Sequence, residues 1–584
     1  DTSAAHVKVA DTARITTAAP NGKSGTWLID PQDFVIAATG GDITGANLSA
    51  QLDTTSVLIQ SVNGATVGNG DILLNDAINK TGAVANSLTL QAVNHINLNA
   101  NIISTGGALD VILNADSDSS GFGAVNLGTT TISLNGGTMS ALAGVGSSGV
   151  VNLAAGTATL NSAINVSTLN ISGGILTDNF GITLPGVLNW TSGSINGTGT
   201  LTTPLNSTVN LSGSFVQAIN KVWNNAGTVT FTNGGAVWLS GLSGTFNNQA
   251  GGILNYNGFN SSPVSFGTLN TVNHIFNNAG TLNKNANSAA TQTVDIVFNN
   301  TGTVNVNTGT LALGGGGTSS GVFSLATGAG LDFFGGVHSL TGVTAISGTG
   351  TLSFSGGAET ISGSIAATSL MGSGGIATLN GVVTIPTATV SAGSVTFGNA
   401  AGISLTTLNL TGGTLTSHAG LSAANYTHTS GTLNIGGTTL LQSGGSMAIN
   451  GAIASSVGGS LTLQAINNIV LGTGGSITGT VVPLNVTLNS NATGLGGGIS
   501  LAAGTSINSN GGDITMGGGV TPATGYAIGT AGSGNSGIDV FGNITAGAGN
   551  VTLHGQSALG NGITFGGGLL SSDGVVTIDG MTFW

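Results

Sequence analysis

The amino-acid sequence predicts an all-β protein, a parallel β-helix in which coils of roughly 20–25 residues stack as a solenoid. Two observations indicate this fold: short phrases recur at nearly constant spacing, and the composition suits strands and turns. Of the 584 residues, 103 are glycine, and Ser, Thr and Asn fill most polar positions. Such a composition opposes helix formation, while a hydrophobic content of 40% is too high for a disordered chain. We therefore expect a folded protein with almost no helix.

One repeat is an aromatic residue followed by two asparagines, spaced by 23, 30 and 22 residues along the chain. In three of the four copies a Gly-Thr phrase follows. One tryptophan occupies the position of three phenylalanines, which predicts that this position forms a layer of the core. The aromatic residues are Trp223, Phe246, Phe276 and Phe298.

A second repeat links two distant parts of the chain. The stretch from Leu88 to Ile96, LTLQAVNHI, returns as LTLQAINNI from Leu461 to Ile469. The phrase LDVILN that begins at Leu109 matches LNVTLN at Leu484, so the two offsets are 373 and 375 residues (88 to 461 and 109 to 484). We therefore expect the same kind of coil in both parts.

Each repeat supplies a turn and a short alternating strand that cannot bury an apolar face alone. Strands stacked about 4.8 Å apart bury one continuous core. Glycine is expected where a coil turns with positive φ, and asparagine is its best substitute. Outward Thr and Ser fit the pleated surface and can hydrogen-bond along the stack. Identical charges in every coil would repel one another, which explains why only 4% of the residues are charged.

A block early in the chain, APNGKSGTWLIDPQDFVIAA, contains the pattern GxWLIDPxD. It resembles a block of the large filamentous haemagglutinin-like exoproteins of two-partner secretion systems, where it follows the amino-terminal secretion domain. Only a strand-like stretch, residues 6–17, precedes it here, so we expect the secretion domain to be missing. The pattern is carried by Gly25, Trp27, Asp30, Pro31 and Asp33.

The resemblance continues in the phrases LNADSDSSG and VNLAAGT and again toward the end of the chain. We accordingly divide one continuous solenoid into residues 1–160, residues 161–429 with the GTL/FNN-type repeats, and residues 430–584. The resemblance implies a right-handed parallel β-helix, export by an outer-membrane secretion partner, and an extracellular or bacterial cell-surface location. It also implies adhesion, aggregation or a biofilm-matrix role, with a possible cell-surface or glycan receptor.

Charge and cysteine content argue against several function classes. The net charge is -13, and no Lys or Arg follows Lys284, so nucleic acid is a poor partner because phosphate binding needs clustered cations. The absence of cysteine removes disulfides, thiolate metal sites and cysteine nucleophiles. No apolar run reaches the length of a membrane span.

The acidic residues give only weak candidate sites. Asp116 and Asp118 alternate on a turn and are the best calcium candidates, but calcium prefers about six or more oxygen ligands, so a solvated loop is the favoured interpretation. Asp30 and Asp33 flank Pro31, a corner where Asp side chains are expected to cap backbone amides. We expect no metal, no cofactor and no catalytic residue.

A carbohydrate-active β-helix enzyme, a polysaccharide lyase or hydrolase, is the alternative class. Its chemistry needs facing carboxylates, or carboxylates beside a cation. Asp53 and Asp76 are 23 residues apart and Asp11 and Asp33 are 22 apart, so each pair could meet across adjacent coils. Neither pair has a cation adjacent in sequence, so we predict a protein that is not an enzyme.

A surface fibre or self-assembling filament is therefore the predicted function, and a monomeric adhesin stalk cut from a longer exoprotein is the alternative. The end of a β-helix exposes an unpaired coil unless an element caps it, and we find no cap at either end of the sequence. We expect head-to-tail stacking into a homopolymer, with residues 1–17 pairing with the coil of a neighbouring copy. Phe583 and Trp584 are candidate assembly residues, because an exposed apolar end would be sticky.

Overall fold

The computed structural model describes residues 1–584 except positions 20, 23, 63–69, 145–146, 214–216, 241–243, 267–273, 286–290, 495, 530–534 and 583–584. Two compact units make up the chain: unit 1, Asp1–Val304, and unit 2, Asn305–Trp584. The assembly candidates Phe583 and Trp584 lie outside the described residues.

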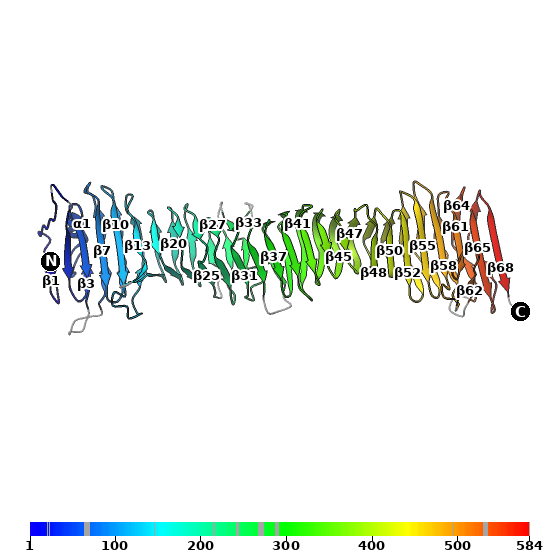
Figure 1. Ribbon diagram of the computed structural model, residues 1–584, viewed down its shortest axis with the longest axis horizontal. Helices are drawn as coiled ribbons and strands as arrows, with labels where there is room; N and C mark the ends of the chain where they lie inside the picture. The colour runs from blue at the N-terminus through cyan, green and yellow to red at the C-terminus, as the bar shows by residue number, and fades with distance from the viewer. Residues whose placement is uncertain are drawn as a thin grey trace. The chain divides into compact units, whose positions relative to one another are not determined.

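Unit 1 is a parallel β-solenoid with three strands in most coils (Figure 1). In one coil these are β27 (Val222–Asn225), β28 (Thr228–Phe231) and β29 (Val237–Leu239). They pair in parallel with the three strands of the next coil, β30, β31 and β32. Equivalent strands of successive coils thus form three ladders, named face A, face B and face C.

Face A consists of β1 (Thr2–Ser3), β2 (Thr26–Asp30), β4 (Ser56–Gln60), β7 (Asn86–Ala92), β10 (Leu109–Ala115), β13 (Met139–Ala141), β18 (Ile164–Val166), β21 (Ile182–Thr183), β24 (Leu201–Thr203), β27, β30 (Thr245–Asn248), β33 (Ile275–Asn278) and β36 (Val297–Asn300). Face B consists of β3 (Phe34–Ile36), β5 (Ile72–Leu74), β8 (Ile96–Leu98), β11 (Val125–Leu127), β16 (Val150–Leu153), β19 (Thr168–Ile171), β22 (Val187–Trp190), β25 (Thr208–Leu211), β28, β31 (Ile253–Tyr256) and β34 (Thr281–Lys284). Face C consists of β6 (Ile78–Lys80), β9 (Ile102–Ser104), β12 (Thr130–Ser133), β17 (Thr157–Leu160), β20 (Ile175–Asp178), β23 (Ser194–Asn196), β26 (Gln217–Ile219), β29 and β32 (Val264–Phe266). Unit 1 also contains β35 (Thr291–Val294) and an antiparallel pair, β14 (Ala143–Gly144) and β15 (Ser147–Ser148), while β37 (Thr303–Val306) contains the boundary between the units.

Unit 2 has the same parallel architecture, but some of its strands bend around a corner. The first half of β41 (Gly330–Leu340) pairs with β38 (Thr310–Leu313), and its second half pairs with β39 (Gly317–Ser319). The register shifts between Phe333 and Val337, where Gly335 and Gly336 lie and Gly336 has a φ of 70°. Two short strands of one coil are therefore continued as one bent strand in the next.

Three further bent strands follow: β43 (Thr351–Ile361), β45 (Ser369–Leu379) and β47 (Thr387–Phe397). β40 (Val322–Leu325) precedes the first bent strand, and β42 (Ala345–Gly348), β44 (Ser364–Ala366) and β46 (Val383–Thr384) run between successive bent strands. The remaining strands are β48 (Ile403–Leu410), β49 (Thr414–Ser417), β50 (Leu421–His428), β51 (Thr432–Ile435), β52 (Thr438–Ser443), β53 (Met447–Ile449), β54 (Ala452–Ser455), β55 (Gly459–Ala465), β56 (Ile469–Leu471), β57 (Ser476–Gly479), β58 (Leu484–Ser490), β59 (Ile499–Leu501), β60 (Ser506–Asn508), β61 (Ile514–Gly518), β62 (Ala527–Gly529), β63 (Ile538–Val540), β64 (Asn543–Gly547), β65 (Val551–Ser557), β66 (Ile563–Phe565), β67 (Leu570–Ser572) and β68 (Val576–Thr582).

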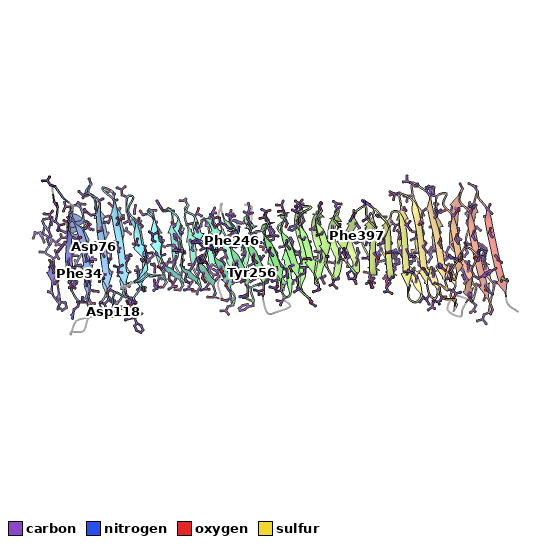
Figure 2. The ribbon with its side chains drawn as sticks, viewed as in Figure 1. Phe34, Asp76, Asp118, Phe246, Tyr256 and Phe397 are labelled. Atoms are coloured by element: carbon purple, nitrogen blue, oxygen red, sulfur yellow. The ribbon has the colours of Figure 1, made fainter. Side chains whose placement is uncertain are left out.

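The predicted all-β parallel solenoid is confirmed in both units. Strands alternate between buried and half-exposed side chains, and the buried positions hold mostly Leu, Ile, Val and Phe. Among the residues labelled in Figure 2, Phe34, Phe246 and Tyr256 are buried. The two copies of the LTLQA phrase end equivalent strands, β7 and β55, and a short strand follows each of them. Sequence similarity between the two parts therefore reflects the same local coil.

One helix interrupts this pattern within the described residues, α1 (Gly45–Leu52). Thr44 caps its first turn by accepting a hydrogen bond from the Asn47 N–H, and the Asp76 carboxylate accepts one from the Gly45 N–H at 2.7 Å. The expectation of almost no helix is confirmed for the described residues, although the sequence analysis did not place α1. A Thr cap followed by apolar residues four apart is a recognisable helix signal in retrospect.

The segment 2–17 lies on the first coil of its own chain. β1 pairs with β2, and the Val9 N–H donates to the Asp42 carbonyl oxygen at 2.7 Å. The Gln51 side chain, on α1, accepts a hydrogen bond from the Ile15 N–H at 2.8 Å. The expectation of an uncapped first coil is therefore wrong for this segment, because α1 and the loop before it supply bonding partners within the chain.

The aromatic residues of the Asn-Asn repeat form one stack inside unit 1. Successive ring centroids are 4.7, 5.2 and 5.0 Å apart, and each side chain is at most 3% exposed. Contacts of this kind stabilise a core beyond the area that they bury. The stacked residues are Trp223, Phe246, Phe276 and Phe298.

We predict that Phe276→Ala lowers the free energy of unfolding of unit 1 by about 3–5 kcal/mol, because it opens a cavity between two stacked rings. The shift of the urea unfolding midpoint, followed by circular dichroism, measures this loss. Ile275→Ala on the outward side of the same strand is the control, and its effect should be much smaller. Equal losses for the two variants would contradict a stacked core.

Candidate functional surface

The outer surface of face B carries a ladder of asparagine side chains. Each Nδ2 donates to the Oδ1 of the asparagine one coil earlier, at 2.8–3.0 Å. The amides are thus ordered along the stack and carry no charge. The ladder consists of Asn97, Asn126, Asn152, Asn170, Asn189 and Asn210.

A second asparagine ladder lies on the inward side of face A, where each asparagine follows a residue of the aromatic stack by two positions. Its side chains are at most 1% exposed and are joined by hydrogen bonds of 2.8–2.9 Å. Sequence reasoning expected asparagine at turns and in outward ladders and did not predict this buried ladder, although the strict Asn-Asn recurrence was a usable signal. Buried amides need partners, and stacking of identical residues provides them. The ladder consists of Asn225, Asn248, Asn278 and Asn300.

Carboxylate and imidazole groups at the start of face B connect one coil to the next. Asp33 Oδ1 accepts a hydrogen bond from the Asp71 N–H at 2.9 Å, and Asp71 Oδ1 accepts one from the His95 N–H at 3.0 Å. His95 Nδ1 in turn accepts from the Ala124 N–H at 3.1 Å. These side chains satisfy backbone amides where each coil turns.

The other residues of the GxWLIDPxD block are structural as well. Trp27 points into the core and is 2% exposed. Gly25 donates its N–H to the Thr17 carbonyl oxygen at 3.0 Å, and Pro31 is buried at the corner. Oδ1 of Asp30 is buried and has no hydrogen-bond partner, so the expected cap is not made by this oxygen. The block builds the first coil and brings no set of reactive groups together.

The calcium candidates lie on a loop that is bonded to itself. Asp116 is 5% exposed with a φ of 62°, and its Oδ1 accepts hydrogen bonds from the Ser120 hydroxyl and the Gly121 N–H, both at 2.9 Å. Asp118 Oδ1 accepts a hydrogen bond from the Ser120 N–H at 3.1 Å. Within the part of the chain that the structure describes, no group of three or more acidic or histidine side chains could hold a metal ion.

In each of the two aspartate pairs that we considered as catalytic carboxylates, the two members accept hydrogen bonds from different groups of the chain. Asp53 and Asp76 line the same surface depression of about 390 Å³. Asp53 Oδ1 accepts hydrogen bonds from the N–H groups of Thr81 and Gly82 at 2.8 and 2.5 Å, while Asp76 binds the first N–H of α1. Asp11 accepts a hydrogen bond from the Thr44 hydroxyl, whereas Asp33 belongs to the face B corners.

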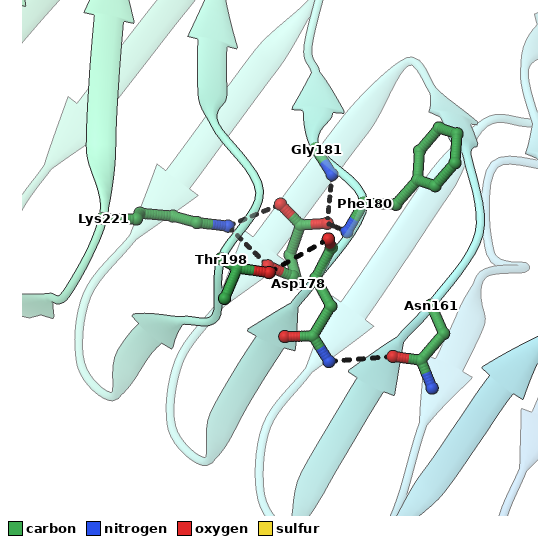
Figure 3. A network of polar contacts seen from close by, with 7 residues as sticks. Asn161, Asp178, Phe180, Gly181, Thr198 and Lys221 are labelled. Carbon is green, nitrogen blue, oxygen red and sulfur yellow. Dashed lines mark hydrogen bonds and ion pairs between the residues drawn. The ribbon is translucent and has the colours of Figure 1, made fainter.

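A lysine and an aspartate form an ion pair in the core of unit 1 (Figure 3). Lys221 Nζ lies 2.5 Å from Asp178 Oδ2, and each side chain is 1% exposed. Asp178 Oδ1 accepts a further hydrogen bond from the Gly181 N–H at 2.8 Å. Burial lowers the pKa of Lys221, while its hydrogen bond to Asp178 and the carboxylate charge oppose that shift.

A glycine in the intervening coil makes this contact between more distant coils possible. Asp178 and Lys221 are 43 residues apart, which is about two coils. A Cβ on Gly199 would lie 2.8 Å from Asp178 Oδ2. The sequence offered no pairing signal, because only the fold brings together residues at this separation.

Unit 2 holds a buried carboxyl group without hydrogen-bond partners. Glu359 is 2% exposed, and neither carboxyl oxygen makes a hydrogen bond. Burial and the neighbouring Asp332 carboxylate raise the pKa of Glu359 to about 8. His338, its register partner in β41, has a pKa lowered to about 4 by burial. Both groups are therefore neutral over much of the pH range between these values.

Most of the described tryptophans are buried, so their rings are not available for stacking on a sugar. Trp27, Trp190 and Trp223 are at most 2% exposed. Trp238 is 36% exposed on the outside of face C, between Ala218 and Ser265 in the neighbouring coils. Trp238 is therefore the exposed tryptophan of the described residues.

Comparison of the chain with protein-family models found no match, and comparison with curated proteins found none either. Among the described residues, no helix is both long and apolar enough to cross a membrane.

We predict that Lys221→Met destabilises unit 1 by about 3–5 kcal/mol, because it leaves the Asp178 carboxylate buried without its cation. The double variant Asp178→Asn with Lys221→Met should recover part of this loss, since it removes both charges. Urea unfolding midpoints of the three proteins measure the difference. A double variant that is less stable than Lys221→Met would contradict this account.

We predict that unit 2 loses stability as the pH rises from 6.5 to 8. The folded pKa of Glu359, about 8, exceeds its ordinary value of 4.5; its stabilising contribution is complete below 4.5 and falls as pH rises toward 8. His338 acts oppositely, since its lowered pKa removes stability as pH falls from 6.5 toward 4. Above pH 6.5 the glutamate effect therefore dominates.

Unfolding midpoints at pH 6.5 and 8 test this, with Glu359→Gln as the informative variant and Thr360→Gln on the exposed side of the same strand as control. The Glu359→Gln protein should lose most of the pH dependence in this range. If the unfolding midpoint of Glu359→Gln changed between pH 6.5 and 8 as much as that of the wild type, the pH dependence would not come from ionisation of Glu359.

Proposed function

We propose that the protein is a structural component of an extracellular fibre, able to assemble into filaments. The observation that carries this proposal is the uniform stacking of parallel coils, with uncharged amide ladders along the outer surface. Stacked coils present a repetitive surface within each unit. Its low charge favours association over dispersal.

The coil formed by β66, β67 and β68 supports axial assembly. Val576 and Ile578 stand in register with the fully buried Val551 and Leu553 of the preceding coil. They are nevertheless 41% and 49% exposed. A further coil stacked on β68 would bury them and satisfy its backbone edge, as β68 does for β65. Stacking of coil on coil is the contact that we propose between copies of the chain.

The resemblance of the Gly25–Asp33 block to filamentous haemagglutinin-like exoproteins supports the remainder of the proposal. It favours secretion through an outer-membrane partner, a location on the bacterial surface, and a role in adhesion or a biofilm matrix. If the receptor is a glycan, its sugar rings could stack on the indole of Trp238, which is 36% exposed. We propose that the protein is not an enzyme, because the carboxylates of the two aspartate pairs accept hydrogen bonds from backbone and hydroxyl groups of their own chain.

Electron microscopy of the purified chain tests the assembly. We expect long filaments of uniform width, and Val576→Asp with Ile578→Asp should shorten them by placing charges in the contact. Thr577→Asp, outward on the same strand, is the matched control and should leave filament length unchanged. Isolated particles at every protein concentration would refute the filament and favour the adhesin stalk.

A further inference from the structure

Face B of unit 1 has a regular outward surface from β8 to β34. Beside the asparagine ladder runs a second file in which every residue is β-branched and half-buried or exposed. Strand register places its members next to one another in successive coils. The file consists of Val150, Thr168, Val187, Thr208, Thr228, Ile253 and Thr281.

The asparagine file continues past its hydrogen-bonded part. Asn210 is followed in register by Thr230, then by Asn255 and Asn283, and the last two are joined by a hydrogen bond of 2.9 Å. None of the outward residues on these strands is charged or aromatic. The surface therefore combines a file of methyl-bearing side chains with a file of ordered amides.

Two physical properties make this surface suited to a copy of itself. The amides are already held by axial hydrogen bonds, so little side-chain entropy is lost on contact. Uncharged files of β-branched and Asn side chains can interdigitate between two facing sheets without repulsion. A sugar chain is less favoured, because the surface offers no aromatic ring for stacking.

The area of the surface is sufficient for a stable contact. Seven strands of four residues, each about 13 Å long, and two of three residues, each about 10 Å long, are spaced by about 4.8 Å and give roughly 530 Å² per copy. Pairing would bury about 1,100 Å² in total, which exceeds the roughly 1,000 Å² expected of a specific interface.

We propose that two copies of the protein associate laterally through face B of unit 1, with their sheets packed face to face. The inference rests on the proposed fibre function and extends it, because it names the surface by which neighbouring fibres bundle. The contact is formed between outward side chains and leaves the axial edge at β68 free.

Engineered cysteines locate the contact, because the sequence contains no other cysteine. Val187 lies on the central strand of the surface, and Thr183 is exposed on face A of the same coil. Val187→Cys should form disulfide-linked pairs at least about tenfold faster than Thr183→Cys, because disulfide formation needs Cβ atoms about 4 Å apart. Equal rates for the two variants would overturn the proposal.

Charge substitution gives an independent readout. Thr208→Lys with Thr228→Lys should weaken lateral association by about tenfold or more, because it would bury unpaired ammonium groups. Thr183→Lys with Thr202→Lys adds the same charge to face A and should leave association unchanged. Sedimentation velocity measures association, and circular dichroism checks that each variant folds. Equal weakening by both double variants would refute the face B contact.

Electron microscopy separates this inference from the proposed function. Single filaments that never pair, in wild type as in the face B variant, would refute lateral pairing and leave the fibre intact. Laterally paired particles that never elongate would refute the filament and leave the face B contact standing.

Discussion

Hydrogen bonding between successive coils is the constraint on which the rest of this structure depends. Each strand finds its backbone partners in equivalent strands of neighbouring coils, so residues at the same position stack on one another. Whatever occupies a position must therefore tolerate a similar neighbour at about 4.8 Å. Aliphatic residues, aromatic rings and amides satisfy this condition, whereas like charges do not.

Asparagine side chains at stacked positions hydrogen-bond to one another, and these bonds fix their orientation. An asparagine side chain has a donor and an acceptor, so a file of them bonds to itself whether it lies outside, as on face B, or inside, as beside the aromatic stack. A buried charged group cannot be stabilised by an identical neighbour, so it needs an opposite charge or must be neutral. Lys221 reaches Asp178 past a glycine. Glu359 is protonated at neutral pH because burial and the neighbouring Asp332 carboxylate raise its pKa to about 8.

The same property connects the fold to the proposed function. A file that bonds to itself leaves a surface without charge and with little conformational freedom, which suits association with an identical surface. The proposed axial contact and the proposed lateral contact through face B differ in chemistry, since the first joins backbone groups and apolar side chains and the second joins ordered amides and methyl groups. The two proposed contacts can therefore be disrupted by different substitutions.

The sequence by itself determined the parallel solenoid and the coil length, because recurring phrases report directly on stacked positions. It also indicated the aromatic layer, since Trp223 replaces phenylalanine at an otherwise constant position. It did not reveal the Asp178–Lys221 pair, the fate of segment 2–17, or the direction of each asparagine. The direction of each asparagine depends on whether a side chain at a strand end points inward, for which the Asn-Asn recurrence is only an indirect signal. Segment 2–17 is placed by partners about one coil away, and Lys221 meets Asp178 after about two coils. Tertiary structure decided these contacts, because the distance between such groups is set by the winding of the whole coil.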